Sequence, residues 1–221
     1  VGEILVKFHP DANNHAVDVI EAEGCEAELP GLMQFFHNSV ATAAWDKENL
    51  GIDGKQRYIM PIVLWALKKY EKPVRRAFAA TNGKFLDTKK MADGIIGIGN
   101  KMGEGWLLTA EMMELQQTGF ENIICAQPFA CLPNHVVGKG MFRALRTRYP
   151  EANIVAVDYD PGASEVNQLN RIKLMLATAL QDPEARDGEV LQLVDVEEPA
   201  SCGGSSSVML GMPTIPTRRA A

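Results

Sequence analysis

Two of the four cysteines, Cys125 and Cys131, stand six positions apart in the segment CAQPFACLPNHVVGKGM. Thiolates ligate zinc and iron–sulfur clusters, although this spacing is that of neither a zinc ribbon nor a ferredoxin. His135 or a partner chain would have to complete a metal site. Free cysteines are also among the residues that most often fill a protein core. The pair therefore predicts either metal ligation by Cys125 and Cys131 or simple packing.

Polar side chains accompany the cysteines along the same segment. Gln127, Asn134 and His135 belong to the loop itself, and we expect them to contribute to a ligand site. Lys139 and Arg143 follow, four positions apart on one face of an expected helix. Such a pair near a helix start can hold a phosphate group, or it can form a solvated basic face. Both interpretations stay open for these two residues.

A second polar set follows at the spacing i, i+3, i+4 and i+7, which places its members on one helix face. The set consists of Ser164, Asn167, Gln168 and Arg171. Amide groups and a guanidinium are costly to bury without partners. We therefore expect this face either to bind a ligand or to brace the cysteine loop.

Apolar runs alternate with helical patterns along the chain. Strands are expected at residues 4–8, 25–29, 122–125 and 153–157, and a large helical insertion at about 31–118 separates the second strand from the third. Alternating strands and helices imply a parallel sheet covered by helices, and right-handed crossovers give the strand order 2-1-3-4. The predicted fold class is α/β: a Rossmann-like three-layer domain over residues 1–182, followed by a tail at 183–221 that is rich in Gly, Ser and Pro.

The predicted topology brings two loops together. Ligands of open parallel sheets bind outside the carboxyl ends of the strands, where the loops 125–135 and 159–164 both begin. Asp158 and Asp160 stand at this end and could act as acid or base. The Asp160-Pro-Gly sequence is, however, typical of a turn and a helix cap, which is the favoured role. A glycine-rich run at 94–105 loosely resembles a dinucleotide fingerprint, but a bend between closely packed helices is favoured there.

The composition excludes several classes of protein. The chain has 221 residues, 46% of them hydrophobic and 23% charged, which is typical of one folded domain with an appendage. Its net charge of −6 lacks the basic footprint of a nucleic-acid-binding protein. No apolar run approaches the roughly 20 residues needed to span a bilayer. The absence of a signal-peptide pattern, with too few cysteines for a disulfide scaffold, predicts a cytoplasmic protein without membrane association.

Three segments carry a resemblance to a known family: CAQPFACLPNHVVGKGM, NIVAVDYDPGASEVNQLNRIKLML and GIGNKMGEGWLLTAEM. They resemble the C-terminal part of the large acyl-CoA dehydratase activase-related proteins, which are similar to the 2-hydroxyacyl-CoA dehydratase and benzoyl-CoA reductase subunits. The opening 30 residues are similar to the segment that enters the C-terminal α/β domain of that family. The resemblance covers about residues 1–179.

The resemblance implies oxygen-sensitive iron–sulfur chemistry on a CoA thioester in an anaerobic cytoplasm, as in a 2-hydroxyglutaryl-CoA dehydratase. It implies a [4Fe-4S] cluster with Cys125 and Cys131 as ligands, and an ATP-dependent activase or other domains of a larger polypeptide as partners. A homodimer is left open. Dehydratase subunits draw further cysteines from an earlier domain, so we expect this chain alone to turn over nothing. The alternative is a non-catalytic domain that binds a CoA ester or docks the activase, with structural cysteines.

Overall fold

The computed structural model describes residues 1–52, 59, 62–63, 65–66, 69 and 85–181. The chain divides into two units, Val1–Ala177 and Thr178–Ala221. The sheet and the polar residues around it belong to the first unit. Of the second unit, only the last turn of a helix that ends at Gln181 is described, so the predicted tail at 183–221 lies outside the described residues.

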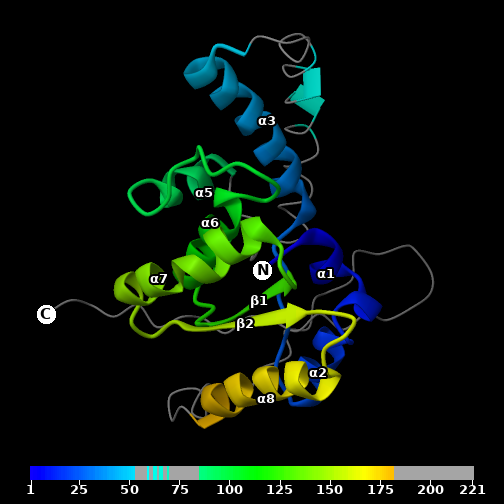
Figure 1. The fold of residues 1–221 in the computed structure, drawn as a ribbon. Helices are drawn as coiled ribbons and strands as arrows, with labels where there is room; N and C mark the ends of the chain where they lie inside the picture. The colour runs from blue at the N-terminus through cyan, green and yellow to red at the C-terminus, as the bar shows by residue number, and fades with distance from the viewer. Residues whose placement is uncertain (53–58, 60–61, 64, 67–68, 70–84, 182–221) are drawn as a thin grey trace, which may run out of the picture. The chain divides into compact units, whose positions relative to one another are not determined.

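A parallel pair of strands forms the centre of the first unit. Strand β1 (Asn122–Pro128) pairs with β2 (Asn153–Tyr159), and the register runs from Asn122 opposite Asn153 to Pro128 opposite Tyr159. Helix α7 (Phe142–Arg148) connects them, which makes a β-α-β unit (Figure 1). The third and fourth predicted strands are therefore confirmed, and both extend beyond their predicted ends. The mixed α/β class of the protein is confirmed with them.

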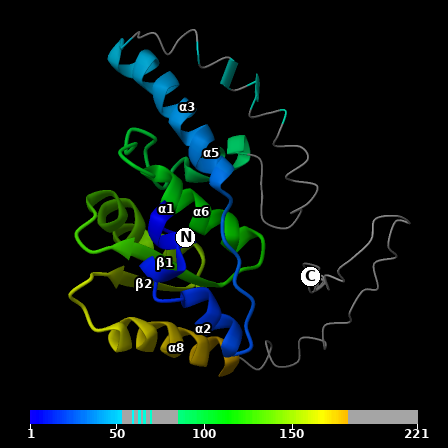
Figure 2. The same ribbon diagram turned by 90° about the vertical axis from the view of Figure 1, so that its right-hand side faces the viewer.

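Helices cover both faces of the strand pair, because the side chains of each strand alternate between two apolar clusters. One cluster joins Ile123 and Ile154 to α6 (Trp106–Gln117) and α7. The other joins Ala126 and Val157 to α2 (Ala16–Ala22) and α8 (Glu165–Gln181), which lie on the opposite side of the strands (Figure 2). The predicted three-layer arrangement is present around these two strands.

The stretch predicted as a helical insertion is helical where it is described. It contains α3 (Leu32–Leu50), α5 (Phe85–Ala92) and α6, and no strand among its described residues. The side chains of α6 are buried over nearly its whole length. Gln34 of α3 and Thr88 of α5 both donate hydrogen bonds to Glu114 of α6, at 2.8 and 3.1 Å. The buried helix α6 thus links the other two helices to the sheet.

The first predicted strand is wrong: Ile4–Phe8 forms helix α1. The Glu3 carboxylate accepts a hydrogen bond from the Val6 backbone N–H at 2.9 Å, which caps the helix. The chain just before α1 instead lies along the free edge of β1, where Gly2 forms a parallel bridge with Ala126. The place beside β1 is that predicted for strand 1, but only residues 1–3 occupy it.

The second predicted strand, at Cys25–Leu29, is also wrong, since this segment has no strand partner among the described residues. It directly follows α2, which ends at Ala22 and is followed by Gly24 in a left-handed conformation with φ of +86°. Asn13 caps the start of this helix, since its Oδ1 accepts from the Ala16 N–H at 3.1 Å. A 3₁₀ turn at Pro10–Ala12 precedes that cap. The four-strand order 2-1-3-4 is therefore not confirmed.

The connection from β1 to α7 is irregular. After β1 the chain makes a tight turn, then a π-helical turn (Asn134–Gly138) and a 3₁₀ turn (Lys139–Met141), before α7 begins. The π-helical turn packs on α6, where Thr109 Oγ1 donates to the Val137 carbonyl at 2.5 Å. A single π turn inside a helical segment commonly marks a functional site. Here it carries Asn134 and His135.

Candidate functional site at the carboxyl ends of the strands

The last residues of β1 and β2 place two polar side chains side by side. Gln127 lies opposite Asp158 in the ladder, and paired residues of neighbouring strands project from the same face of a sheet. This face is the one covered by α6 and α7, so the pair also meets the π-helical turn. Gln127 is completely buried and Asp158 is partly exposed. The pair thus forms the floor of a polar cluster that reaches solvent.

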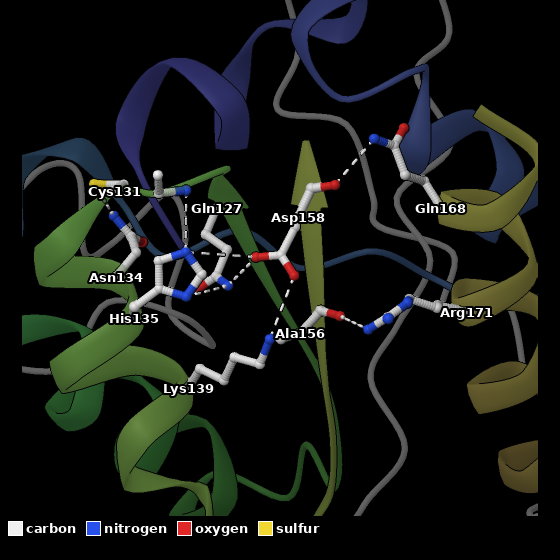
Figure 3. A network of polar contacts seen from close by, with 10 residues as sticks. Gln127, Cys131, Asn134, His135, Lys139, Ala156, Asp158, Gln168 and Arg171 are labelled. Atoms are coloured by element: carbon white, nitrogen blue, oxygen red, sulfur yellow. Dashed lines mark hydrogen bonds and ion pairs between the residues drawn. The ribbon is translucent and has the colours of Figure 1, made fainter. Parts of the chain in front are cut away.

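Asp158 is the centre of this cluster (Figure 3). One carboxylate oxygen, Oδ1, accepts a hydrogen bond from the Gln127 amide and lies 3.8 Å from His135 Nε2. The other, Oδ2, lies 3.4 Å from Lys139 Nζ. Two groups able to carry positive charge therefore flank one carboxylate, and all three side chains keep some contact with solvent. The net charge of the cluster depends on whether the His135 ring is protonated.

The His135 ring has a hydrogen-bond donor at each nitrogen. The backbone N–H of Ala130 donates to Nε2 at 3.1 Å, and Gln127 Nε2 lies 3.4 Å from Nδ1. A neutral imidazole carries a proton on one nitrogen and accepts only at the other. With Nε2 accepting, Nδ1–H needs an acceptor, and Gln127 Oε1 is a buried oxygen with no partner among the described residues. Turning the Gln127 amide would satisfy His135 but would remove a donor from Asp158.

The cluster therefore has two hydrogen-bonding arrangements that differ in the direction of one amide. A ligand that donates to Asp158 would replace the donor lost on turning the amide, and would therefore favour the arrangement in which Gln127 Oε1 faces His135. Histidine is the residue type best suited to proton exchange near neutral pH. Chemically, the site can bind a polar group such as a carbonyl and can exchange a proton with it.

The turn that follows β1 lies over this floor and exposes apolar side chains. Ala130 adopts a left-handed conformation with φ of +60°, which is uncommon for a residue other than glycine. The turn is closed by the Cys131 N–H, which donates to the Pro128 carbonyl at 3.2 Å. The exposed apolar side chains around the polar cluster are those of Phe129, Leu132 and Val136. The site thus combines a polar floor with an apolar rim.

The two predicted metal ligands lie in different surroundings. Cys125 lies within β1, one ladder row before Gln127, and its side chain is fully buried in the apolar cluster beneath α6 and α7. Burial raises the pKa of its thiol to about 11, so the thiol is protonated near neutral pH. Cys131 lies in the exposed turn, where Asn134 Nδ2 donates to its sulfur at 3.1 Å. Only Cys131 resembles an accessible ligand.

A complete cluster site does not fit the described residues. They contain no group of three or more His, Cys, Asp or Glu side chains that could hold a metal ion. A [4Fe-4S] cluster needs about four such ligands, usually thiolates. Cys131 could supply one, while Cys125 would have to lose its proton inside an apolar core. The part of the chain that the structure describes therefore provides at most a fraction of such a site.

Four of the predicted ligand residues are brought together, and the others are dispersed. Gln127, Asn134, His135 and Lys139 surround the carboxyl ends of the strands (Figure 3). Arg143 and Asn167 are exposed on α7 and α8 respectively, and the Ser164 carbonyl accepts the first hydrogen bonds of α8. The remaining two have backbone partners on β2: Gln168 Nε2 donates to the Asp158 carbonyl, and Arg171 Nη1 to that of Ala156.

Asp158 was predicted only as a possible acid or base and was not part of the predicted ligand set, although it is the central residue of the cluster. For Asp160 the favoured turn role is present, since its Oδ1 accepts from the Gly162 N–H at 2.9 Å. The signal for Asp158 is the ladder register that places it opposite Gln127, and a single sequence does not reveal register. The Ala130 N–H was missed for a similar reason, because only the turn geometry aims it at His135.

The fold and the cluster together define an α/β domain that presents a polar site at the carboxyl ends of parallel strands. No family model, curated protein or solved structure matches this chain. Within the described ranges, no helix is both long and apolar enough to cross a membrane.

Proposed function

We propose that this chain is a CoA-ester-binding domain of a 2-hydroxyacyl-CoA dehydratase-like system in an anaerobic cytoplasm. The observation that carries the proposal is the cluster of Gln127, His135, Lys139 and Asp158 at the carboxyl end of the strand pair, where ligands of such sheets bind. An ATP-dependent activase, or other domains of a larger polypeptide, would supply the redox chemistry.

The chemistry of the site matches the thioester end of such a ligand. A CoA thioester brings an apolar arm with amide groups and a carbonyl oxygen. Lys139 and His135 offer donors for that oxygen, and Asp158 accepts from an amide N–H. The exposed Phe129 and Leu132 side chains offer apolar contact for the arm. In this function Cys125 is a packing residue, as its burial indicates.

Binding can be tested by titrating the chain with acetyl-CoA in a calorimeter. The variant Lys139→Met removes one charged donor and should weaken binding about tenfold or more, since a hydrogen bond to a charged group contributes roughly 1.5–3 kcal/mol. Arg148→Met is the matched control, because it removes the same charge from the exposed end of α7. Absence of any heat of binding with acetyl-CoA or free CoA would refute the proposal.

A second function rests on Cys131, which lies at the mouth of the site with an amide donor on its sulfur. Hydrogen bonds to cysteine sulfur tune iron–sulfur sites, so this residue could provide one ligand of a cluster shared with a partner. Anaerobic reconstitution with iron and sulfide tests this function. It predicts a brown chromophore that Cys131→Ser abolishes and that Cys125→Ser leaves in place. If both variants lose the chromophore equally, Cys125 and Cys131 would both be ligands, as the sequence predicted.

A further inference from the structure

The outward edge of β2 is closed by side chains rather than by another strand. The Asn153 N–H donates to Glu121 and the Tyr159 carbonyl accepts from Phe129, so the odd-numbered residues of β2 face β1. In a parallel strand, the N–H and C=O of one residue point to the same side, and alternate residues point to opposite sides. The peptide groups of Ile154, Ala156 and Asp158 therefore point outward, where no other strand among the described residues pairs with them.

All three outward carbonyls accept a hydrogen bond from a side chain. Arg146 Nη2 donates to Ile154 at 2.6 Å, Arg171 Nη1 to Ala156 at 3.2 Å, and Gln168 Nε2 to Asp158 at 2.9 Å. Arg146 comes from α7, on one face of the sheet, whereas the other two come from α8, on the opposite face (Figure 3 shows the α8 contacts). The donors thus reach the edge of β2 from both faces of the sheet and bind three successive outward-pointing carbonyls.

These are the groups through which a further strand would pair. An unpaired sheet edge is a template for another chain, and proteins commonly protect such edges with charged side chains. A guanidinium is always charged and has only donors, so it binds the carbonyl but offers nothing to the strand N–H. An approaching strand would have to displace both arginines. Arg143 and Arg148 of the same helix α7 are exposed like Arg146, but unlike Arg146 they make no hydrogen bond to an outward β2 carbonyl among the described residues.

We propose that Arg146, Gln168 and Arg171 guard this edge and prevent β2 from pairing with β2 of a second copy of the chain. A two-fold symmetric pair of identical strands is antiparallel. The three outward residues are symmetric about Ala156, so such a pair would place Ile154 opposite Asp158 of the partner subunit. Both strands would then present matching rows of donors and acceptors once the arginines are removed.

The test replaces both guarding arginines in the 221-residue chain, as Arg146→Met with Arg171→Met. Methionine keeps much of the apolar stem and removes the donors. Sedimentation velocity over a range of concentrations should show self-association at least about tenfold stronger than that of the wild type. Hydrogen exchange should show new protection at the amides of Ile154, Ala156 and Asp158. The control, Arg143→Met with Arg148→Met, loses the same charge and should behave as the wild type.

Two results would overturn the proposal: a folded double variant that associates no more than the wild type, or a control that associates equally. A measurement on the wild type keeps the proposal testable even if the double variant does not fold. The outward amides of Ile154 and Ala156 should exchange faster than the β1-facing amides of Val155 and Val157. Equal protection of both sets would mean that another strand already covers the edge, and the guard role would be wrong.

Discussion

The bodies of the two strands and their carboxyl ends differ sharply, although they share one face of one sheet. Three successive ladder rows run along this face: Ile123 with Ile154, Cys125 with Ala156, and Gln127 with Asp158. All four residues of the first two rows are buried, three of them in one apolar cluster, and the third row is a hydrogen-bonded polar pair. Each row lies about 7 Å from the next. A core and a candidate site can therefore be built from adjacent rows of the same strands.

The difference has a physical use. The buried rows fix the positions of the strand ends, so the polar row is held by packing that takes no part in binding. The two cysteines show the same division, because Cys125 belongs to the packed body and Cys131 to the exposed end. Changes in the body should therefore alter stability, and changes at the end should alter binding with little effect on stability.

Leu145→Ala should have the largest effect on stability. Leu145 of α7 is fully buried in the cluster beneath the apolar rows, so the variant loses transfer free energy and leaves a cavity. We expect the free energy of unfolding to fall by about 2–5 kcal/mol in denaturant titrations. Leu132→Ala is the matched change at the exposed end, where the effect should stay within about 0.5 kcal/mol. Similar losses of stability at Leu145 and Leu132 would contradict the distinction between a packed strand body and an exposed binding end.

The pH dependence of stability should report on the buried thiol. Burial raises the pKa of the Cys125 thiol from its ordinary value of 9.0 to about 11 in the folded state. Between these values the unfolded chain loses a proton that the folded chain keeps, so stability is fully present below about pH 9 and is lost as the pH rises. The slope is at most about 1.4 kcal/mol per pH unit.

The measurement is a series of denaturant titrations at pH values from about 8 to about 11, which span the two pKa values of the thiol. It compares the wild type with Cys125→Ser and Cys131→Ser. Cys125→Ser removes the titrating thiol, so its curve should be flatter than that of the wild type. Cys131→Ser is the control for the chemical replacement itself, because it makes the same change in the turn after β1, outside the apolar cluster. If the free energy of unfolding falls with pH equally in the wild type and in Cys125→Ser, the buried thiol does not contribute to the pH dependence of stability.

Local pattern predicts the parts of this fold in which local preference and tertiary packing agree. The starts of β1 and β2, the helix α6 and the helix α8 follow from apolar periodicity, which packing on both faces of the sheet then satisfies. Ile4–Phe8 shows the opposite case. Its apolar run is typical of a strand, but the Glu3 cap and the buried ion pair of Lys7 with Glu111 on α6, at 3.7 Å, accompany a helix there.

The candidate site was predictable in place but not in detail. The carboxyl ends of parallel strands predict where it lies, and four of the predicted residues are there. The strand was expected to end at Cys125, and its continuation to Pro128 moves that thiol from the loop into the core. Register and side-chain direction decide the rest. They place Asp158 at the centre and turn Gln168 and Arg171 toward backbone carbonyls of β2.

A close contact between the π-helical turn and the strand body should give a smaller stability effect than Leu145→Ala. Gly138 of the π-helical turn crosses over Cys125, and a Cβ added there would lie 3.1 Å from the sulfur. Gly138→Ala should therefore cost about 1–2 kcal/mol, as overpacking of a filled core usually does. In a Cys125→Ala background the sulfur is absent, so much of that cost should be recovered. A double-mutant cycle measures this coupling. If the cost of Gly138→Ala is the same in both backgrounds, the backbone of the turn rather than the buried thiol limits the approach of the π-helical turn to the sheet.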